Sequence, residues 1–203
     1  PSGEEQPDKV SDIVAGWKKA AKIYGAQASL EDLQEVINSL NELVEEAEED
    51  DTCCQYPVHE AAKIGAVKLM EFMLRTSFDM NAKEDDFGST ALHLACIYGQ
   101  TETAQLIIQS SKEFGIDLNA KDNNGSTAWH LACINGQTET AQLLIQSSKE
   151  FGIDLNAKSN FGGTALHWAC GNGKTETVQL IFQSSKDFGI DLNAKDDDGC
   201  TAF

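Results

Sequence analysis

The chain has 203 residues, of which 33 are acidic and 15 are basic, and its net charge at pH 7 is −18. This charge disfavours binding to nucleic acid, which requires clustered Lys and Arg, and to anionic membranes, and it favours basic protein partners. No apolar run approaches the roughly 18 residues that span a bilayer, so we expect no membrane segment.

Residues 1–50 are predicted to form an acidic segment of two helices, at about 10–25 and 30–49. Residues 1–52 hold 14 acidic and 4 basic side chains, a net of −10. An apolar stripe that includes Trp17 ends at Gly25, and Ser29 then starts the second helix as an N-cap, with Asp32 three residues on. The second helix keeps heptad spacing for about two and a half heptads, which is short for a coiled coil.

Three roles are open for this segment. It could cap the repeats that follow it in the chain, mediate dimerisation through its heptads, or supply a partner or membrane helix built on residues 17–22. We favour the cap, because the open end of a stacked array needs a polar cover. A monomer is therefore expected, with a dimer through the N-terminal helices as the alternative.

The rest of the chain is a set of internal repeats. Residues 122–158 are followed by a near copy at 159–195, and residues 84–121 carry the same text with one extra residue. Units of this length cannot bury a core alone and predict a stacked solenoid. The predicted units are 51–83, 84–121, 122–158, 159–195 and a truncated 196–203, which suggests a fragment of a longer array.

Each repeat has the same internal order. A turn signal such as Gly125-Ser126-Thr127 precedes a short helical run, which Gly136 closes. A second helix and an extended Asp-Leu-Asn-Ala-Lys stretch follow, so each unit is predicted as helix, tight turn, helix and loop. The four histidines of the chain occupy one position of this pattern: His59, His93, His130 and His167.

The sequence around these histidines resembles the ankyrin-repeat motif T-P-L-H-x-A. Thr90–Cys96 reads Thr-Ala-Leu-His-Leu-Ala-Cys, and 127–133, 164–170 and 56–62 are variants of it. The resemblance covers about three-quarters of the chain and implies an all-α ankyrin-repeat solenoid with finger loops, here with an N-terminal helical capping segment. It also implies that the histidine orients the loop by hydrogen bonds and that the cysteine is a buried small residue.

Two length differences carry structural predictions. The later repeats exceed the 33 residues of 51–83 by four, which adds about one turn to the second helix. Phe114, Phe151 and Phe188 end this extension and are predicted to stack as a hydrophobic rung on the convex side. The extra residue in 84–88 predicts a first finger loop that protrudes or bulges.

The repeated His-x-x-Cys pairs predict neither a metal site nor a disulfide ladder. Neighbouring helices pack about 8–10 Å apart, too far for one tetrahedral site or for a disulfide. Free cysteines instead favour a reducing compartment, and we expect a cytoplasmic protein, with the nucleus as alternative. No nucleophile–base pair lies outside structural positions, so we expect no enzyme and no cofactor.

The resemblance places partner binding at the finger tips and late in the first helix of each repeat. We predict a non-catalytic protein-interaction module that favours a basic or Arg-containing segment. The alternative is a regulatory or targeting region of a larger enzyme, channel or transcription-factor inhibitor. The predicted contact residues are Asp85, Asp86, Phe87, Ile97, Tyr98, Asn123, Asn124, Ile134, Asn135, Asn160, Phe161 and Asn172.

Two tryptophans and three asparagines have structural or open roles. Trp129 replaces a core Leu and is predicted to pack, whereas Trp168 is compatible with packing or binding. The Asp-Leu-Asn-Ala stretch resembles the site of an asparaginyl hydroxylase in ankyrin proteins, although turn geometry alone accounts for the asparagine. The residues concerned are Asn119, Asn156 and Asn193.

Overall fold

The computed structural model describes residues 57–75, 78–84 and 86–203, and this part of the chain is built from paired helices without strands. The pairs are α3 (Pro57–Ile64) with α4 (Val67–Leu74), α5 (Ala91–Tyr98) with α6 (Thr101–Phe114), α7 (Ala128–Asn135) with α8 (Thr138–Phe151), and α9 (Ala165–Gly171) with α10 (Thr175–Phe188). The predicted segment 1–50 lies outside the described residues, so its cap, dimer and partner-helix roles stay predictions.

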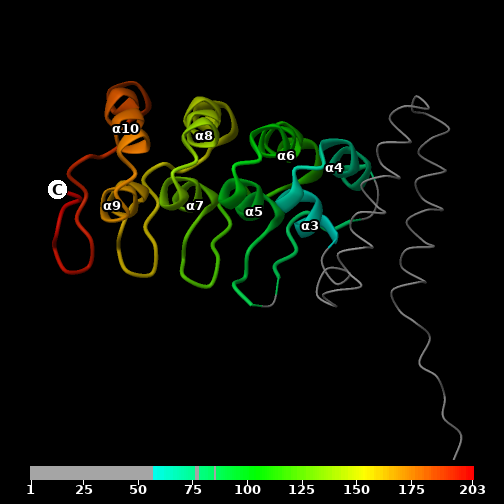
Figure 1. Cartoon of the computed structure of the whole chain (residues 1–203), viewed down its shortest axis with the longest axis horizontal. Helices are drawn as coiled ribbons and strands as arrows, with labels where there is room; N and C mark the ends of the chain where they lie inside the picture. The colour runs from blue at the N-terminus through cyan, green and yellow to red at the C-terminus, as the bar shows by residue number, and fades with distance from the viewer. Residues whose placement is uncertain (1–56, 76–77, 85) are drawn as a thin grey trace, which may run out of the picture.

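The pairs stack side by side into a solenoid (Figure 1). The inner helices α3, α5, α7 and α9 form one row, the outer helices α4, α6, α8 and α10 form a second, and the finger loops project from the inner row. A finger loop is the segment between the outer helix of one repeat and the inner helix of the next. The predicted all-α ankyrin solenoid is confirmed.

Each inner helix begins and ends where its sequence dictates. Thr127 is extended and precedes α7, and its backbone N–H and its hydroxyl both donate to His130 Nδ1, at 3.1 and 2.9 Å. At the other end, Gly136 adopts a φ of +74°, a left-handed conformation that glycine reaches without steric cost. The helix therefore cannot extend, and the chain turns into α8.

The core lies between the two helix rows. In α8 the buried side chains Ala141, Leu144 and Ile145 follow three- and four-residue spacing, and the same positions of α6 are buried. Trp129 is also fully buried, and its Nε1–H donates to the Leu155 carbonyl oxygen at 3.1 Å. Its predicted packing role is confirmed.

The outer helices of the later repeats are longer, as predicted, but by six residues rather than the four inserted ones. α4 has 8 residues, whereas α6, α8 and α10 each have 14. The predicted rung of phenylalanines differs in detail, because a lysine of the preceding repeat lies over the rings of Phe151 and Phe188. Lys112 Nζ is 4.7 Å from the centre of the Phe151 ring, and Lys149 Nζ is 5.0 Å from that of Phe188. Lysine ammonium groups and phenylalanine rings therefore alternate along the outer side. The lysine side chains cover part of each half-buried ring, so the rings do not form a continuous apolar strip.

The asparagines of the Asp-Leu-Asn-Ala stretch tie successive repeats together. Asn119 donates from Nδ2 to the Gly152 carbonyl oxygen at 2.8 Å, and its Oδ1 accepts from the Asp154 N–H at 2.8 Å. Asn156 makes the same two bonds one repeat later, to Gly189 and Asp191. Both amide groups are therefore engaged between repeats, which gives these residues a structural role that does not depend on hydroxylation.

Candidate partner-binding surface

Each finger loop is closed by the carboxylate or hydroxyl at its start. Asp122 Oδ1 accepts from the backbone N–H groups of Asn124 and Ser126, at 2.9 and 2.7 Å. In the first finger, Glu84 Oε1 accepts from Phe87 and Ser89, at 2.9 and 3.3 Å, although the loop holds one more residue. The Glu84 side chain is one methylene longer than that of Asp122, which compensates for the extra residue in this loop. The extra residue is accommodated within the same turn design, and Asp85 itself lies outside the described residues.

Successive fingers are joined through the backbone at their tips. The N–H of Asn123 donates to the Phe87 carbonyl oxygen at 2.8 Å, and the N–H of Asn160 donates to that of Asn124 at 2.9 Å. The N–H of Asp197 donates to that of Phe161 at 3.4 Å. These bonds use only main-chain atoms, so they place no requirement on the side chains of Phe87, Asn124 and Phe161.

The tip side chains point into solvent. Phe87 is 64% exposed and Phe161 is 61% exposed, while Asn124, at the equivalent position of the finger between them, is also exposed. Asp86 on the first finger is exposed as well. Because burial of large apolar rings is a main source of stability, two rings left in water at one repeat position mark this face as the candidate surface.

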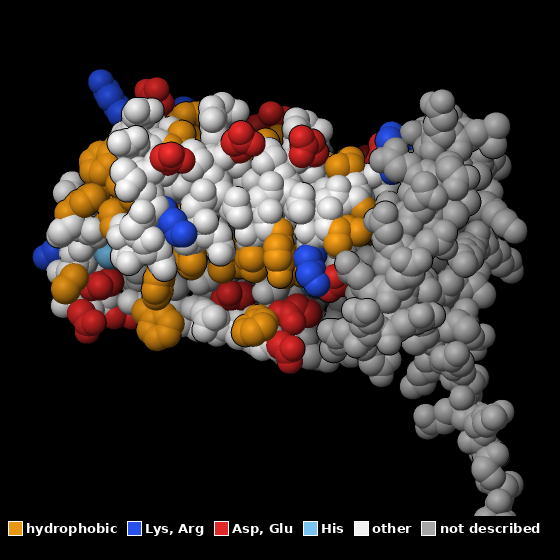
Figure 2. Space-filling view, viewed as in Figure 1, with side chains coloured by type: hydrophobic (Ala, Val, Ile, Leu, Met, Phe, Trp, Pro, Cys, Tyr) orange, Lys and Arg blue, Asp and Glu red, His pale blue; other side chains and the backbone are white. Residues whose placement is uncertain are grey.

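The inner helices supply the second part of the surface. Leu94, Ile97 and Tyr98 lie three and four residues apart on one face of α5, and Tyr98 is 50% exposed. Leu131 and Ile134 repeat this pattern on α7 and are half-buried. Figure 2 shows hydrophobic side chains in a band across the inner helices, with acidic side chains below it on the finger loops.

Four of the predicted contact residues already use their side-chain amides within the array. The Nδ2 groups of Asn123 and Asn160 donate to carbonyl oxygens of the preceding finger, at 3.2 and 3.1 Å. Those of Asn135 and Asn172 donate to the carbonyl oxygens of Leu131 and Trp168 one turn earlier in the chain, at 2.9 and 2.8 Å. These side chains are exposed but held in place, so a partner would meet them as fixed polar groups.

Sequence reasoning left one feature of this surface unresolved, the environment of Trp168. The indole is half-buried beside Phe161, with ring centres 6.1 Å apart in an edge-on arrangement. Its Nε1 is buried and finds no acceptor among the described residues, unlike that of Trp129. Comparison of equivalent positions between repeats is the signal that reveals it.

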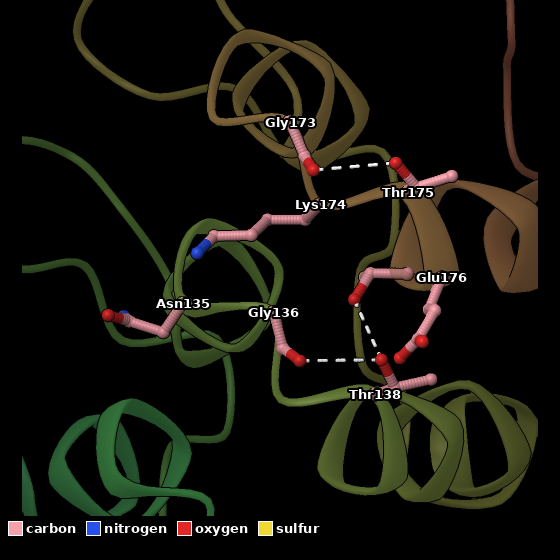
Figure 3. A pocket seen from close by; sticks show the side chains of 8 residues that line it. Asn135, Gly136, Thr138, Gly173, Lys174, Thr175 and Glu176 are labelled. Carbon is pink, nitrogen blue, oxygen red and sulfur yellow. Dashed lines mark hydrogen bonds between the residues drawn. The ribbon is translucent and has the colours of Figure 1, made fainter.

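A polar hollow lies at the C-terminal ends of the inner helices α7 and α9 (Figure 3). It has a volume of about 310 Å³ and is lined by residues of the turns at Gly136 and Gly173, including Lys174, which extends across the end of α7 towards Asn135. The Thr138 hydroxyl lies 3.0 Å from the Thr177 hydroxyl, which joins two neighbouring outer helices. This hollow is therefore part of the scaffold.

The hydrogen bonds between threonine hydroxyls of neighbouring outer helices do not continue to the first described repeat. Thr101 Oγ1 pairs with Thr140 Oγ1 at 2.8 Å, but Thr103 Oγ1, the equivalent of Thr140 one repeat earlier, has no partner among the described residues. Val67 stands where the preceding repeat would need a threonine. The missing hydrogen bond follows directly from that replacement.

The chemistry of the thiols and imidazoles is structural. Burial raises the pKa of the Cys96 and Cys133 thiols, which keeps them protonated and poor as ligands or nucleophiles. Burial also lowers the pKa of His59, His93 and His130. Within the three described ranges, no group of three or more His, Cys, Asp or Glu side chains could hold a metal ion.

The family model for ankyrin repeats (3 copies) matches the chain over residues 26–122 and 112–196. The chain belongs to the ankyrin-repeat family. Ankyrin repeats are generally protein–protein interaction modules and are typically non-catalytic. No curated protein matches this ankyrin array in sequence. Across the part of the chain that is described, no helix is both long and apolar enough to cross a membrane.

Proposed function

We propose that this ankyrin array is a non-catalytic module that binds a partner protein through its finger tips and the exposed face of its inner helices. The observation that carries this proposal is the exposure of Phe87, Tyr98 and Phe161, at 64%, 50% and 61%, on the finger and inner-helix side. Scattered apolar side chains on a surface need no function, but these recur at the positions that the scaffold leaves variable.

The size of these rings makes them suitable anchors. An aromatic side chain buries roughly 150–250 Å² when covered, and apolar burial stabilises by roughly 25 cal/mol per Å². Anchors of this kind cost about 2 kcal/mol or more when truncated to Ala. Two or three such rings, spread over neighbouring fingers, are enough to centre an interface.

The charge of the surface favours a basic partner. The tip residues Asp86, Asp197 and Asp198 are exposed. Asp86 precedes Phe87, and Asp198 stands at the position that Phe87 and Phe161 occupy in their fingers. Exposed carboxylates accelerate association with a cationic partner and contribute less at high salt, since the Debye length is about 8 Å at physiological ionic strength. We therefore expect affinity to fall as salt rises.

The cysteines support a reducing compartment, and we propose a cytoplasmic location on that basis. Among the described residues, Cys96, Cys133, Cys170 and Cys200 are all free thiols. We also propose that the array binds as a monomer.

Affinity capture from the source cell tests the proposed function. The bait is the full chain, compared with the triple variant Phe87→Ala, Tyr98→Ala and Phe161→Ala. Phe114→Ala is the matched control, because it removes a ring that is 39% exposed at the end of outer helix α6, away from the inner-helix face. A protein captured by the wild type and the control but not by the triple variant supports the proposal. Equal capture by all three baits would place binding elsewhere.

A further inference from the structure

The inner helices of the second and third repeats carry apolar side chains that the core does not use. We call these side chains the apolar band, and they are Leu94, Ile97 and Tyr98 on α5 and Leu131 and Ile134 on α7. Leu94 packs against the core, whereas Ile97, Leu131 and Ile134 are half-buried without packing against it. The band lies in the interior of the array, between α3 and α9 (Figure 1). Packing of the repeats therefore does not explain its apolar character.

The first repeat shows that the fold accepts charged residues at the same positions. Glu60 and Lys63 stand on α3 where α5 has Leu94 and Ile97, and Lys63 Nζ lies 3.0 Å from Glu60 Oε2. An inner helix thus forms equally well with an ion pair on this face. The apolar residues of the second and third repeats are a property of the surface, and a contiguous apolar surface rimmed by polar residues is typical of a protein-binding site.

The finger beside α5 is the most acidic of the first three. Residues 84–86 are Glu-Asp-Asp, and residues 84–90 include no lysine or arginine. Asp86 is exposed and accepts from Asn123 Nδ2 through its backbone carbonyl oxygen, at 3.2 Å, which leaves its carboxylate available. The preceding Lys83 donates to the Lys121 carbonyl oxygen at 2.6 Å. A partner segment along the band therefore needs an apolar side towards the inner helices and a basic side towards this finger.

This arrangement fits an α-helix better than an extended segment. The band and the acidic side chains of the fingers adjoin each other along the array (Figure 2). A β-strand points successive side chains to opposite faces, so it cannot present an apolar and a basic stripe to two adjoining surfaces. An amphipathic helix carries two such stripes side by side along its length.

The period of a helix also fits the spacing of the repeats. Residues seven apart in a helix are about 10.5 Å apart along its axis, close to the roughly 8–10 Å between packed inner helices. A polyproline II segment repeats every three residues, or about 9.3 Å, but places only one side chain per turn on a given side. The band offers two or three side chains on each inner helix, which matches the pairs of apolar residues that a helix presents at three- and four-residue spacing.

We propose that the partner segment is a basic amphipathic α-helix that lies across α5 and α7. Its apolar stripe contacts the apolar band, and its basic residues lie beside Asp86. A helix of about 18 residues is roughly 27 Å long, which is enough to cross three inner helices. This inference rests on the proposed function and names the kind of segment that the surface binds.

The test is an NMR titration of the full chain, labelled at its Ile and Leu methyl groups, with three peptides of about 18 residues. The first peptide has leucines at helical spacing and lysines on the adjoining stripe. The second has the same composition in shuffled order, so that the leucines are spread around the helix, and the third has two central prolines that break the helix. The first peptide should shift the Ile97 and Ile134 methyl resonances saturably. The shuffled peptide should leave them unchanged, and the proline peptide should bind at least tenfold more weakly.

A double variant tests the apolar band without changing the net charge. Leu94→Glu with Ile97→Lys gives α5 the ion pair that α3 carries, so the protein should fold and bind the amphipathic peptide at least tenfold more weakly. Gln105→Glu with Gln109→Lys is the matched control. It introduces the same charges at exposed positions of the outer helix α6 and should leave the affinity unchanged.

A second pair of variants tests the acidic finger. Asp86→Asn removes the carboxylate beside the band and should weaken binding of the amphipathic peptide. Glu113→Gln, at an exposed position of α6, changes the net charge equally and should have no effect. Equal effects of the two variants would show that the peptide responds only to the overall charge of the chain, which would contradict the placement of the basic stripe.

Four further results would overturn the helix assignment: no saturable shift with the amphipathic peptide, equal shifts with the shuffled peptide, equal binding of the proline peptide, or unchanged binding by the Leu94→Glu, Ile97→Lys variant. The proposed function is judged separately by capture. A partner that is lost by the Phe87, Tyr98 and Phe161 triple variant but retained by the Leu94→Glu, Ile97→Lys variant would support the interaction module and reject a helix on the apolar band.

Discussion

The Nε2–H of His93 donates to the carbonyl oxygen of Ser126 at 3.1 Å, across 33 positions of sequence and one repeat of the array. Its Nδ1 accepts from the Thr90 backbone N–H at 3.0 Å, which requires Nδ1 to be unprotonated and Nε2 to carry the hydrogen. One neutral imidazole thus caps its own helix and holds the next finger. The same ring position links His59 to Ser89, His130 to Gly163 and His167 to Cys200.

Loss of one of these rings should destabilise the array according to its burial. His93→Ala leaves the Thr90 N–H and the Ser126 carbonyl oxygen buried without partners, so we expect the free energy of unfolding to fall by about 3 kcal/mol. His167→Ala is the matched control. The bond from His167 to the Cys200 carbonyl oxygen is exposed, so water can replace it. The substitution should therefore lower the free energy of unfolding by only about 1 kcal/mol. Urea denaturation measures both free energies of unfolding. Equal losses for the two variants would show that the buried histidine bonds between repeats contribute no more than the exposed one.

Stability should fall when the pH drops below about 6.5. The pKa of His59, His93 and His130 lies below the ordinary value of 6.5, mainly because the rings are buried. The unfolded chain then binds more protons than the folded chain at pH values below 6.5, so protonation favours unfolding. The contribution is fully present above pH 6.5 and is lost as the pH falls towards the folded-state pKa.

Urea denaturation between pH 8 and pH 5 checks this dependence. For His93 the burial effect acts against the Ser126 carbonyl oxygen and the Asp122 carboxylate, which both raise the pKa. The double variant His93→Gln and His130→Gln should show a shallower slope than the wild type, although it is less stable. A wild-type stability that is flat from pH 7.5 to pH 5 would show that the folded rings titrate normally.

The fold was predictable from the sequence because each repeat copies the same caps and the same apolar spacing. The longer outer helix followed from counting residues, but the four inserted residues do not account for the whole gain, because α6, α8 and α10 have 14 residues and α4 has 8. The surface was less predictable. The amide of Asn123 is engaged by Asp86 in the preceding finger, and a contact between repeats of this kind has no signal in either loop alone.

The surroundings of Trp168 were beyond prediction for a related reason. Trp168 by itself was compatible with packing, as at Trp129, and Gly163 and Gly171 are ordinary in loops and helix ends. Only the structure shows that Gly163 adjoins the indole, since a Cβ atom there would lie 3.2 Å from Trp168 Nε1.

Glycine substitutions should separate backbone strain from crowding. Gly99 has a φ of +71°, and a Cβ atom there would lie 2.5 Å from the Gln137 side chain, which caps the Ile97 carbonyl oxygen. Gly152 has a φ of +73°, and a Cβ atom there would meet nothing within 4 Å. We expect Gly152→Ala to cost about 1 kcal/mol for the left-handed backbone alone, and Gly99→Ala to cost clearly more.

Thermal unfolding of both variants tests this difference, with Gly171→Ala as the control. Gly171 ends α9 with an ordinary φ and open space around it, so alanine should be neutral or stabilise by up to about 1 kcal/mol. If Gly99→Ala and Gly152→Ala prove equally destabilising, the contact with Gln137 contributes nothing.

Thiol reactivity should follow burial along the array. In a Cys53→Ser and Cys54→Ser background, the exposed Cys200 should react with a disulfide reagent within the first phase, and the half-buried Cys170 more slowly. Cys96 and Cys133 should react only on unfolding, because burial both blocks access and raises the pKa of the thiol. Rapid modification of all four thiols in the native protein would contradict the packing of α5 and α7.

Calorimetry with the captured protein shows whether the finger tips and the inner-helix face bind a partner. Phe161→Ala should weaken binding by about 2 kcal/mol, roughly thirtyfold, because it truncates an exposed anchor at the middle of that face. Phe114→Ala, on the outer side, should leave the dissociation constant within about twofold of the wild type. An unchanged affinity for Phe161→Ala together with a large loss for Phe114→Ala would place the interface on the outer helices and contradict the account.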